Sequence, residues 1–324
     1  MHPYAALTPE VVLDAVAALG LRPDGRLLAL SSYENRVYQV WLEEDAPAVG
    51  SCVVAKFYRP GRWSEAQIDE EHAFAHELAE REIPVVAPIH QGKFSDFIYA
   101  VYPRRGGRTP ELGDPKTLEW IGRFLGRIHA VGATKEFSHR DALTAQSFGH
   151  DARAYLLQTS LVPPDLLDAW KAVTEQALQL VDACYGRAGG VRAIRLHGDC
   201  HPGNILWTED GPHFVDLDDA RMGPAMQDLW MLLSGDRTAM SRQLHEVLKG
   251  YELFMRFERS ELHLLEALRT LRLIHYSAWI ARRWDDPAFP AAFPWFNTQR
   301  YWQDRILELR EQIALMQEEP LAVE

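Results

Sequence analysis

The chain has 324 residues, which is enough for one large domain or two of ordinary size. Apolar residues make up 47% of it and charged residues 25%, a balance that excludes a disordered chain and is typical of a globular protein with a sizeable core. The 34 basic and 46 acidic residues give a formal net charge of −12. Nucleic acids and anionic membranes are therefore poor partners, because both attract basic surfaces.

The three cysteines, Cys52, Cys184 and Cys200, form no CxxC pair, and we expect free thiols in a reducing cytosol. Residues 1–12 lack the basic stretch and apolar run of a secretory signal. No window approaches the ~18 continuous apolar residues of a membrane span. We therefore expect a cytoplasmic protein with no membrane partner, and we take a monomer as the working expectation.

Two helices are predicted near the start of the chain. The first covers residues 8–19, with Thr8 as its N-cap and a proline directly after it. The second covers residues 64–81, where Ser64 and Gln67 have the spacing of a capping box.

The segments around these helices have the composition of β-strands. Residues 37–41, 52–57 and 97–102 are rich in β-branched and aromatic side chains, and residues 43–50 read as a hairpin loop. The glycines and prolines of residues 103–110 indicate a connection.

Beyond this connection the pattern becomes mainly helical. Apolar residues recur at helical spacing over residues 118–128, and further helices are predicted over 164–185 and most of 225–316, with a short β interlude at 194–215. The sequence therefore predicts an α+β protein with a β-rich N-terminal lobe (residues 1–103) and a helix-rich lobe (residues 104–324).

The chemistry is concentrated in the string His197–Asn204 and in the five residues from Val215. Asp199, Asn204 and Asp216 would approach one another if the residues between them formed a small hairpin turning near Glu209. Phosphoryl transfer needs such a set, because one carboxylate orients the attacking hydroxyl while an amide oxygen and a second carboxylate hold Mg²⁺ against the phosphates.

The strings HGDCHPGNILW and FVDLDDAR resemble the signature of the aminoglycoside phosphotransferase and choline kinase superfamily. Four flanking segments resemble its stress response kinases, a branch of bacterial Ser/Thr protein kinases; they are residues 32–38, 56–60, 217–233 and 283–290. The resemblance covers most of the chain and thins over residues 133–190. It implies a bilobal protein-kinase-like fold, with a small antiparallel β-rich N-lobe and a large, mostly helical C-lobe.

The resemblance also implies roles for single residues. Asp199 matches the catalytic base, Asn204 the second metal ligand, and Asp216 the catalytic aspartate that binds the metal. Asp218 and Asp219 lie close enough to compete with Asp216, but motif position favours Asp216.

Three further residues match supporting positions. Lys56 would contact the α- and β-phosphates and pair with a helix carboxylate, for which Glu71 fits the spacing better than Glu70. Asp228 matches the aspartate that braces the catalytic loop. The alternatives are an edge or snorkelling position for Lys56, a solvated acidic face for the glutamate that is not used, and a carboxylate in the first turn of a helix for Asp228.

One segment departs from the protein-kinase pattern. Residues 31–36 stand where a glycine-rich loop would cover the phosphates, and Ser32 could donate its hydroxyl to a phosphate there. Tyr99–Pro103 occupies the position of the interlobe hinge, and the backbone of Val101 would take the adenine edge by fold analogy.

Two clusters could have roles outside phosphoryl transfer. His197, Cys200 and His201 lack a complete zinc ligand set, and we reject a zinc site. The aromatic residues of the C-terminal third are expected to pack between helices more than to line a substrate groove.

The sequence therefore predicts a kinase that uses ATP and Mg²⁺ and acts on a Ser or Thr hydroxyl of a protein, with a role in stress response implied by the resemblance. A small-molecule kinase of the same superfamily remains an alternative, because its catalytic residues would be identical. A pseudokinase scaffold is a third possibility, against which the intact Lys56, Asp199, Asn204 and Asp216 argue.

Overall fold

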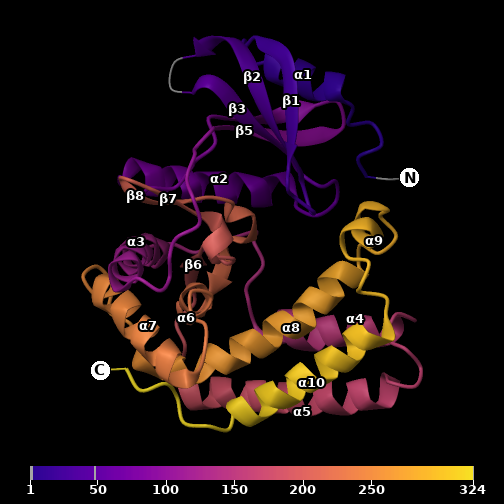
Figure 1. The fold of residues 1–324 in the computed structure, drawn as a ribbon, viewed down its shortest axis with the longest axis vertical. Helices are drawn as coiled ribbons and strands as arrows, with labels where there is room; N and C mark the ends of the chain where they lie inside the picture. The colour runs from indigo at the N-terminus through magenta and orange to yellow at the C-terminus, as the bar shows by residue number, and fades with distance from the viewer. Residues whose placement is uncertain (1–2, 47–48, 324) are drawn as a thin grey trace. The chain divides into compact units, whose positions relative to one another are not determined.

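The computed structural model describes residues 3–46 and 49–323, and the chain divides into two compact units (Figure 1). Unit 1 comprises Met1–Pro110 and Gly203–Asp218, and unit 2 comprises Glu111–Pro202 and Asp219–Glu324. The lobe boundary predicted between residues 103 and 104 stays a prediction.

Unit 1 is built on a five-stranded antiparallel sheet in the order β1-β2-β3-β5-β4. Its strands are β1 (Pro23–Leu30), β2 (Arg36–Ala46), β3 (Gly50–Phe57), β4 (His90–Phe94) and β5 (Phe97–Pro103). The three predicted strands are confirmed, and β1 and β4 complete the sheet. The predicted start of the hairpin loop at residue 43 is wrong, because β2 continues to Ala46; residues 47 and 48 lie outside the described residues.

Helices cover the two faces of this sheet. Val53, Ala55 and Phe57 share a core with α1 (Pro9–Ala17). On the opposite face Tyr58 packs with Ile68 of α2 (Glu65–Glu80). Both helices begin as predicted, since Thr8 and Ser64 cap them and Ser64 forms the full capping box with Gln67. The alternation of β3 therefore directs Lys56 toward the α2 side.

A separate two-stranded hairpin also belongs to unit 1. Strand β7 (Ile205–Thr208) pairs with β8 (Gly211–Phe214), as predicted. Hydrogen bonds of Phe214 with the backbone of Pro84 and Val86 fix the hairpin to the segment that follows α2.

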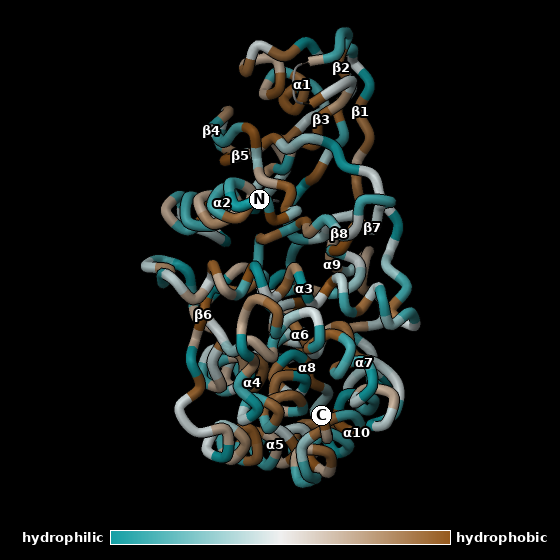
Figure 2. Tube along the Cα trace, turned by 90° about the vertical axis from the view of Figure 1, so that its left-hand side faces the viewer, coloured by the Kyte–Doolittle hydropathy of each residue, from teal (hydrophilic) through white to brown (hydrophobic). Residues whose placement is uncertain are grey.

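Unit 2 is mainly helical. Its helices are α3 (Pro115–Gly132), α4 (Asp151–Gln158), α5 (Leu167–Ala188), α6 (Met226–Trp230), α7 (Arg237–Tyr251), α8 (Leu265–Ala281), α9 (Ala288–Ala292) and α10 (Gln299–Leu315), and its strands β6 (Ile194–Leu196) and β9 (Arg221–Gly223) pair antiparallel. Helices α5, α8 and α10 lie side by side. Hydrophobic and hydrophilic residues alternate at short intervals along them, so each helix has an apolar side to bury (Figure 2).

Helices α3 and α7 touch through their backbones. A Cβ atom on Gly122 would lie 2.0 Å from the Val247 carbonyl oxygen, and one on Gly126 would lie 2.4 Å from that of Tyr251. Only glycine fits at these two positions of α3. The contact matters for the site described below because α3 also carries His129.

Two further predictions are confirmed. The aromatic residues of the C-terminal third are largely core: Phe289, Phe296 and Trp302 are buried, and Trp302 meets Trp170 edge to face. Trp295 is an exception and is 42% exposed. The cysteines of both units are free thiols. Within the described ranges, no helix is both long and apolar enough to cross a membrane.

Candidate active site

One cluster of predicted site residues surrounds Lys56 in unit 1. Lys56 lies in β3 opposite Ala100 and is buried, and its Nζ atom lies 3.5 Å from Glu71 Oε1 of α2. The same Nζ contacts the carboxylate of Asp218 and lies 3.7 Å from Asp216 Oδ1. The structure therefore brings Lys56 and Glu71 together, as the spacing of fifteen residues suggested.

Charge and burial act against each other at Lys56. Burial alone would lower its pKa, but the carboxylates of Asp218 and Glu71 raise the pKa well above its usual value. The rings of Tyr58 and Tyr102 lie 4.9 and 5.2 Å from Nζ and add cation–π attraction. Lys56 is therefore a fixed positive charge in an otherwise acidic chain.

Asp218 also belongs to this cluster, although motif position favoured Asp216 over it as the metal-binding aspartate. It is buried, and its carboxylate accepts hydrogen bonds from Lys56 and from Asn35 Nδ2. Asn35 lies in the loop between β1 and β2, and its Oδ1 accepts from the Arg59 backbone N–H. The loop of residues 31–36 is thus tied to Asp218, a contact that no sequence pattern indicated.

Asp216 is set apart from Asp218 by its backbone and its exposure. Its φ angle is +63°, a left-handed conformation that costs a non-glycine residue free energy and that clusters at functional sites. Its side chain is 52% exposed, compared with 8% for Asp218. Asp216 is therefore the more accessible of the two carboxylates.

The hairpin places Asn204 near Asp216. Asn204 directly precedes β7, and its carbonyl oxygen accepts a hydrogen bond from the N–H of Val215, the neighbour of Asp216. A carboxylate and an amide oxygen are hard donors of the kind that Mg²⁺ prefers. The donor chemistry of this pair therefore fits a magnesium ion, with phosphate oxygens supplying further ligands.

The other two predicted nucleotide contacts lie in the same unit. Ser32 is half-buried in the bend between β1 and β2. Val101 is a buried residue of β5, and its carbonyl oxygen accepts from the Ile89 N–H. Tyr99–Pro103 belongs to the strand β5, so the hinge placement and the adenine contact of Val101 stay predictions.

A separate cluster of predicted site residues lies in unit 2 and centres on Asp199. Its Oδ1 accepts a hydrogen bond of 2.7 Å from Arg272 Nη1 of α8, and its Oδ2 lies 3.5 Å from His201 Nε2. Burial lowers the pKa of His201, so the ring is neutral at pH 7. Arg272 was missed by sequence reasoning, because 73 residues separate it from Asp199 and nothing local marks it.

Asp228 holds the loop that carries Asp199. It is fully buried in α6 and accepts hydrogen bonds from the N–H groups of His197 and Gly198, at 2.9 and 2.8 Å, and from His129 Nε2. Burial would raise its pKa, but these bonds outweigh burial and lower the pKa. The predicted bracing of the loop is confirmed.

Gly198 is required at its place in this loop. Its φ angle is +86°, and a Cβ atom there would lie 2.0 Å from the carbonyl oxygen of Asp219. The two motif strings are therefore in backbone contact within unit 2, at Gly198 and Asp219.

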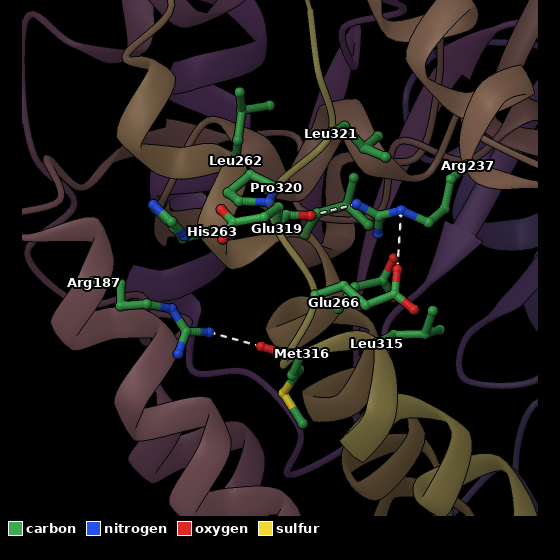
Figure 3. Close-up of a pocket in the computed structure, with 12 residues that line it drawn as sticks. Arg187, Arg237, Leu262, His263, Glu266, Leu315, Met316, Glu319, Pro320 and Leu321 are labelled. Atoms are coloured by element: carbon green, nitrogen blue, oxygen red, sulfur yellow. Dashed lines mark hydrogen bonds and ion pairs between the residues drawn. The ribbon is translucent and has the colours of Figure 1, made fainter.

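A hollow at the C-terminal end of unit 2 contains none of the predicted site residues (Figure 3). Met316 and the residues Glu318–Leu321 form part of its wall. Arg187 Nη2 donates to the Met316 carbonyl at 2.7 Å, and Arg237 Nε lies 3.1 Å from Glu318 Oε2. The hollow is thus bounded by a tethered chain end.

Comparison with known proteins adds to this geometry. A family model described as "Phosphotransferase enzyme family" matches residues 26–265. Stress response kinase A of Salmonella choleraesuis is 43% identical over 327 aligned positions, covering 98% of this chain and 96% of the relative. The serine/threonine protein kinase RdoA of Salmonella typhimurium is 42% identical over the same shares.

Among solved structures, the amicoumacin kinase hAmiN in complex with AMP-PNP, Ca²⁺ and Ami is similar, with a TM-score of 0.71 at 17% sequence identity. The match covers 98% of this chain and 96% of that one. The likeness shows that the chain has the bilobal protein-kinase-like fold that the sequence predicts.

Proposed function

The chain belongs to the phosphotransferase enzyme family and is a kinase related to stress response kinase A, and from this premise we propose that it is an ATP- and Mg²⁺-dependent Ser/Thr protein kinase. The observation that carries the proposal is the buried Lys56, held by Glu71 and Asp218 beside the accessible Asp216. The printed name of the 42% identical relative supports a serine or threonine acceptor.

Each residue has a part in the proposed reaction. Lys56, aligned by Glu71, would contact the nucleotide phosphates, and Asp216 and Asn204 would hold the metal. Mg²⁺ bound there would neutralise phosphate charge. Asp199 takes the proton of the acceptor hydroxyl while the oxygen of that hydroxyl forms a bond to the γ-phosphorus. The bond from that phosphorus to the bridging oxygen breaks, and ADP leaves with the electron pair.

Incubation with γ-labelled ATP tests the proposal. The acceptors are dephosphorylated casein, myelin basic protein and a panel of hydroxyl metabolites, and mass spectrometry locates the label, including any on the kinase itself. We expect label on Ser or Thr. Label that enters only a metabolite would reject the protein-kinase proposal in favour of the small-molecule kinase, and the absence of Mg-ATP binding would favour a scaffold.

Variants test the roles of the two carboxylates. Asp199→Asn and Asp216→Asn are each expected to lower turnover by a factor of about 10³ or more, with an unchanged melting temperature. Asp210→Asn, at the exposed turn of the β7–β8 hairpin, is the matched control and should keep full activity. Full activity in either site variant would remove that residue from the mechanism.

The proposal extends to the cell. We propose that the kinase acts in the cytoplasm as a monomer, and the printed name of its relatives supports a role in stress response. Cell fractionation and light scattering on the purified chain test the first two points, and survival of a deletion strain under oxidative or envelope stress tests the third.

A further inference from the structure

Arg272 is an arginine on the acceptor-binding side of the proposed reaction. It extends from α8, its Nη1 donates to Asp199 Oδ1 at 2.7 Å, and its side chain is 42% exposed. A guanidinium has five N–H donors, and within the described residues Arg272 hydrogen-bonds to Asp199 alone. The remaining N–H donors of Arg272 can therefore reach a ligand that lies beside the Asp199 carboxylate.

Near α8, the charged groups that act on His275 are three arginines and one aspartate. His275 lies one turn beyond Arg272, and its pKa is lowered to about 3, first by burial and then by the charge of Arg221. Arg282 and Arg283 act in the same direction. The opposing acidic group is Asp219, which is itself paired with Arg221 at 2.7 Å.

This arrangement is unsuited to a cationic acceptor. A lone Asp199 carboxylate would attract an amine, but the ion pair with Arg272 offsets its charge. An arginine with spare donors is the preferred partner of a carboxylate or phosphate, because its planar fork matches two oxygens at once.

We propose that Arg272 recognises an anionic group of the acceptor, so that the preferred substrate is a Ser or Thr hydroxyl in a protein segment with an acidic or phosphorylated side chain close by. The inference rests on the proposed function and names the substrate class of the same site. Arg272 would hold this anionic group while the hydroxyl reaches Asp199.

Four peptides that differ only at the residues flanking one serine test the proposal. The flanks are alanine, lysine, glutamate or phosphoserine, and the last two separate a carboxylate from a phosphate as the recognised group. For the wild-type kinase we expect kcat/KM to be at least about fivefold higher with glutamate or phosphoserine than with alanine, and lowest with lysine.

Arg272→Gln should reduce the preference for acidic over alanine flanks to less than about twofold, with the KM for ATP unchanged. Arg310→Gln, at an exposed position of α10, is the matched control and should retain the preference. Labelled versions of the peptides with alanine in place of the serine measure binding without turnover, so the test holds even where Arg272→Gln slows catalysis.

The outcomes separate the two proposals. Equal kcat/KM for all four peptides, or a preference for lysine, would overturn the inference and leave the protein kinase standing. An undiminished preference in Arg272→Gln would also overturn it. Turnover of metabolites with none of the peptides or proteins would overturn the proposed function, and this inference with it.

Discussion

The imidazole of His129 and the carboxylate of Asp228 form a fully buried pair, with His129 Nε2 3.0 Å from Asp228 Oδ2. The same carboxylate accepts hydrogen bonds from the backbone N–H groups of His197 and Gly198. Helix α3 is thereby linked through α6 to the loop of Asp199, so the position of the loop depends on a charge that water does not reach.

Removal of this charge is expected to destabilise the fold. Asp228→Ala leaves buried donors without an acceptor and should lower the free energy of unfolding by about 3–5 kcal/mol. Urea denaturation monitored by tryptophan fluorescence measures the change. Asp210→Ala, on an exposed turn, should stay within about 0.5 kcal/mol of the wild type. Equal stability of the two variants would contradict the bracing role.

Glu261 predicts a dependence of stability on pH. It is buried, its Oε2 accepts from the Met226 N–H at the start of α6, and burial raises its pKa to about 7 from 4.5. The folded state therefore binds the proton of Glu261 more tightly than the unfolded state does. The protonated carboxyl group makes its full contribution to stability below pH 4.5. That contribution, about 3 kcal/mol, is lost as the pH rises from 4.5 through 7.

Glu261→Gln keeps an acceptor for Met226 and removes the titration. The difference in unfolding free energy between wild type and variant should therefore change between pH 4.5 and 7.5 and be flat outside this window. Urea titrations at half-unit pH intervals measure it. Parallel stability curves would show that Glu261 has an ordinary pKa.

Glu71 and Glu70 can be distinguished by nucleotide binding. Glu71 is buried beside Lys56, whereas Glu70 is only half-buried on the same helix. Glu71→Gln should weaken Mg-ATP affinity about tenfold, because Lys56 loses one of the partners that align it. Calorimetric titration measures the affinity, and Glu70→Gln is the control, expected within about twofold. The reverse order would make Glu70 the functional partner.

Two glycines in helices should respond to alanine with opposite signs. Gly122→Ala forces α3 away from the Val247 carbonyl and should cost about 2–3 kcal/mol. At Gly186, an exposed position of α5, an added Cβ meets nothing within 4 Å, so Gly186→Ala should stabilise by about 0.5–1 kcal/mol. Thermal unfolding compares the two, and a gain in stability at Gly122 would refute the backbone contact.

Local signals made much of the fold predictable. The capping box at Ser64 depends on residues three apart, and the alternation of β3 depends on neighbouring side chains. Strand β4 escaped prediction because its sequence, His-Gln-Gly-Lys-Phe, lacks β-branched residues and an apolar alternation. Its structure comes from pairing with β5.

The candidate site also contains residues that local sequence signals reveal and contacts that they do not. The motif strings made Asp199, Asn204 and Asp216 visible because their spacing along the chain is short and ordered. The contacts of Asp218 with Asn35 and of Asp199 with Arg272 join residues 183 and 73 positions apart. Such contacts depend on how the helices and strands pack. The spacing of residues along the sequence therefore does not predict them.

The uneven burial of the three thiols has a practical consequence. Cys184 and Cys200 are buried, and burial raises the pKa of both, whereas Cys52 on β3 is only partly covered. A maleimide dye added to the native protein should therefore attach at Cys52 and leave the loop of Asp199 unmodified. A single label would then report on unit 1 in the natural sequence, without engineered cysteines, and could follow nucleotide binding by fluorescence.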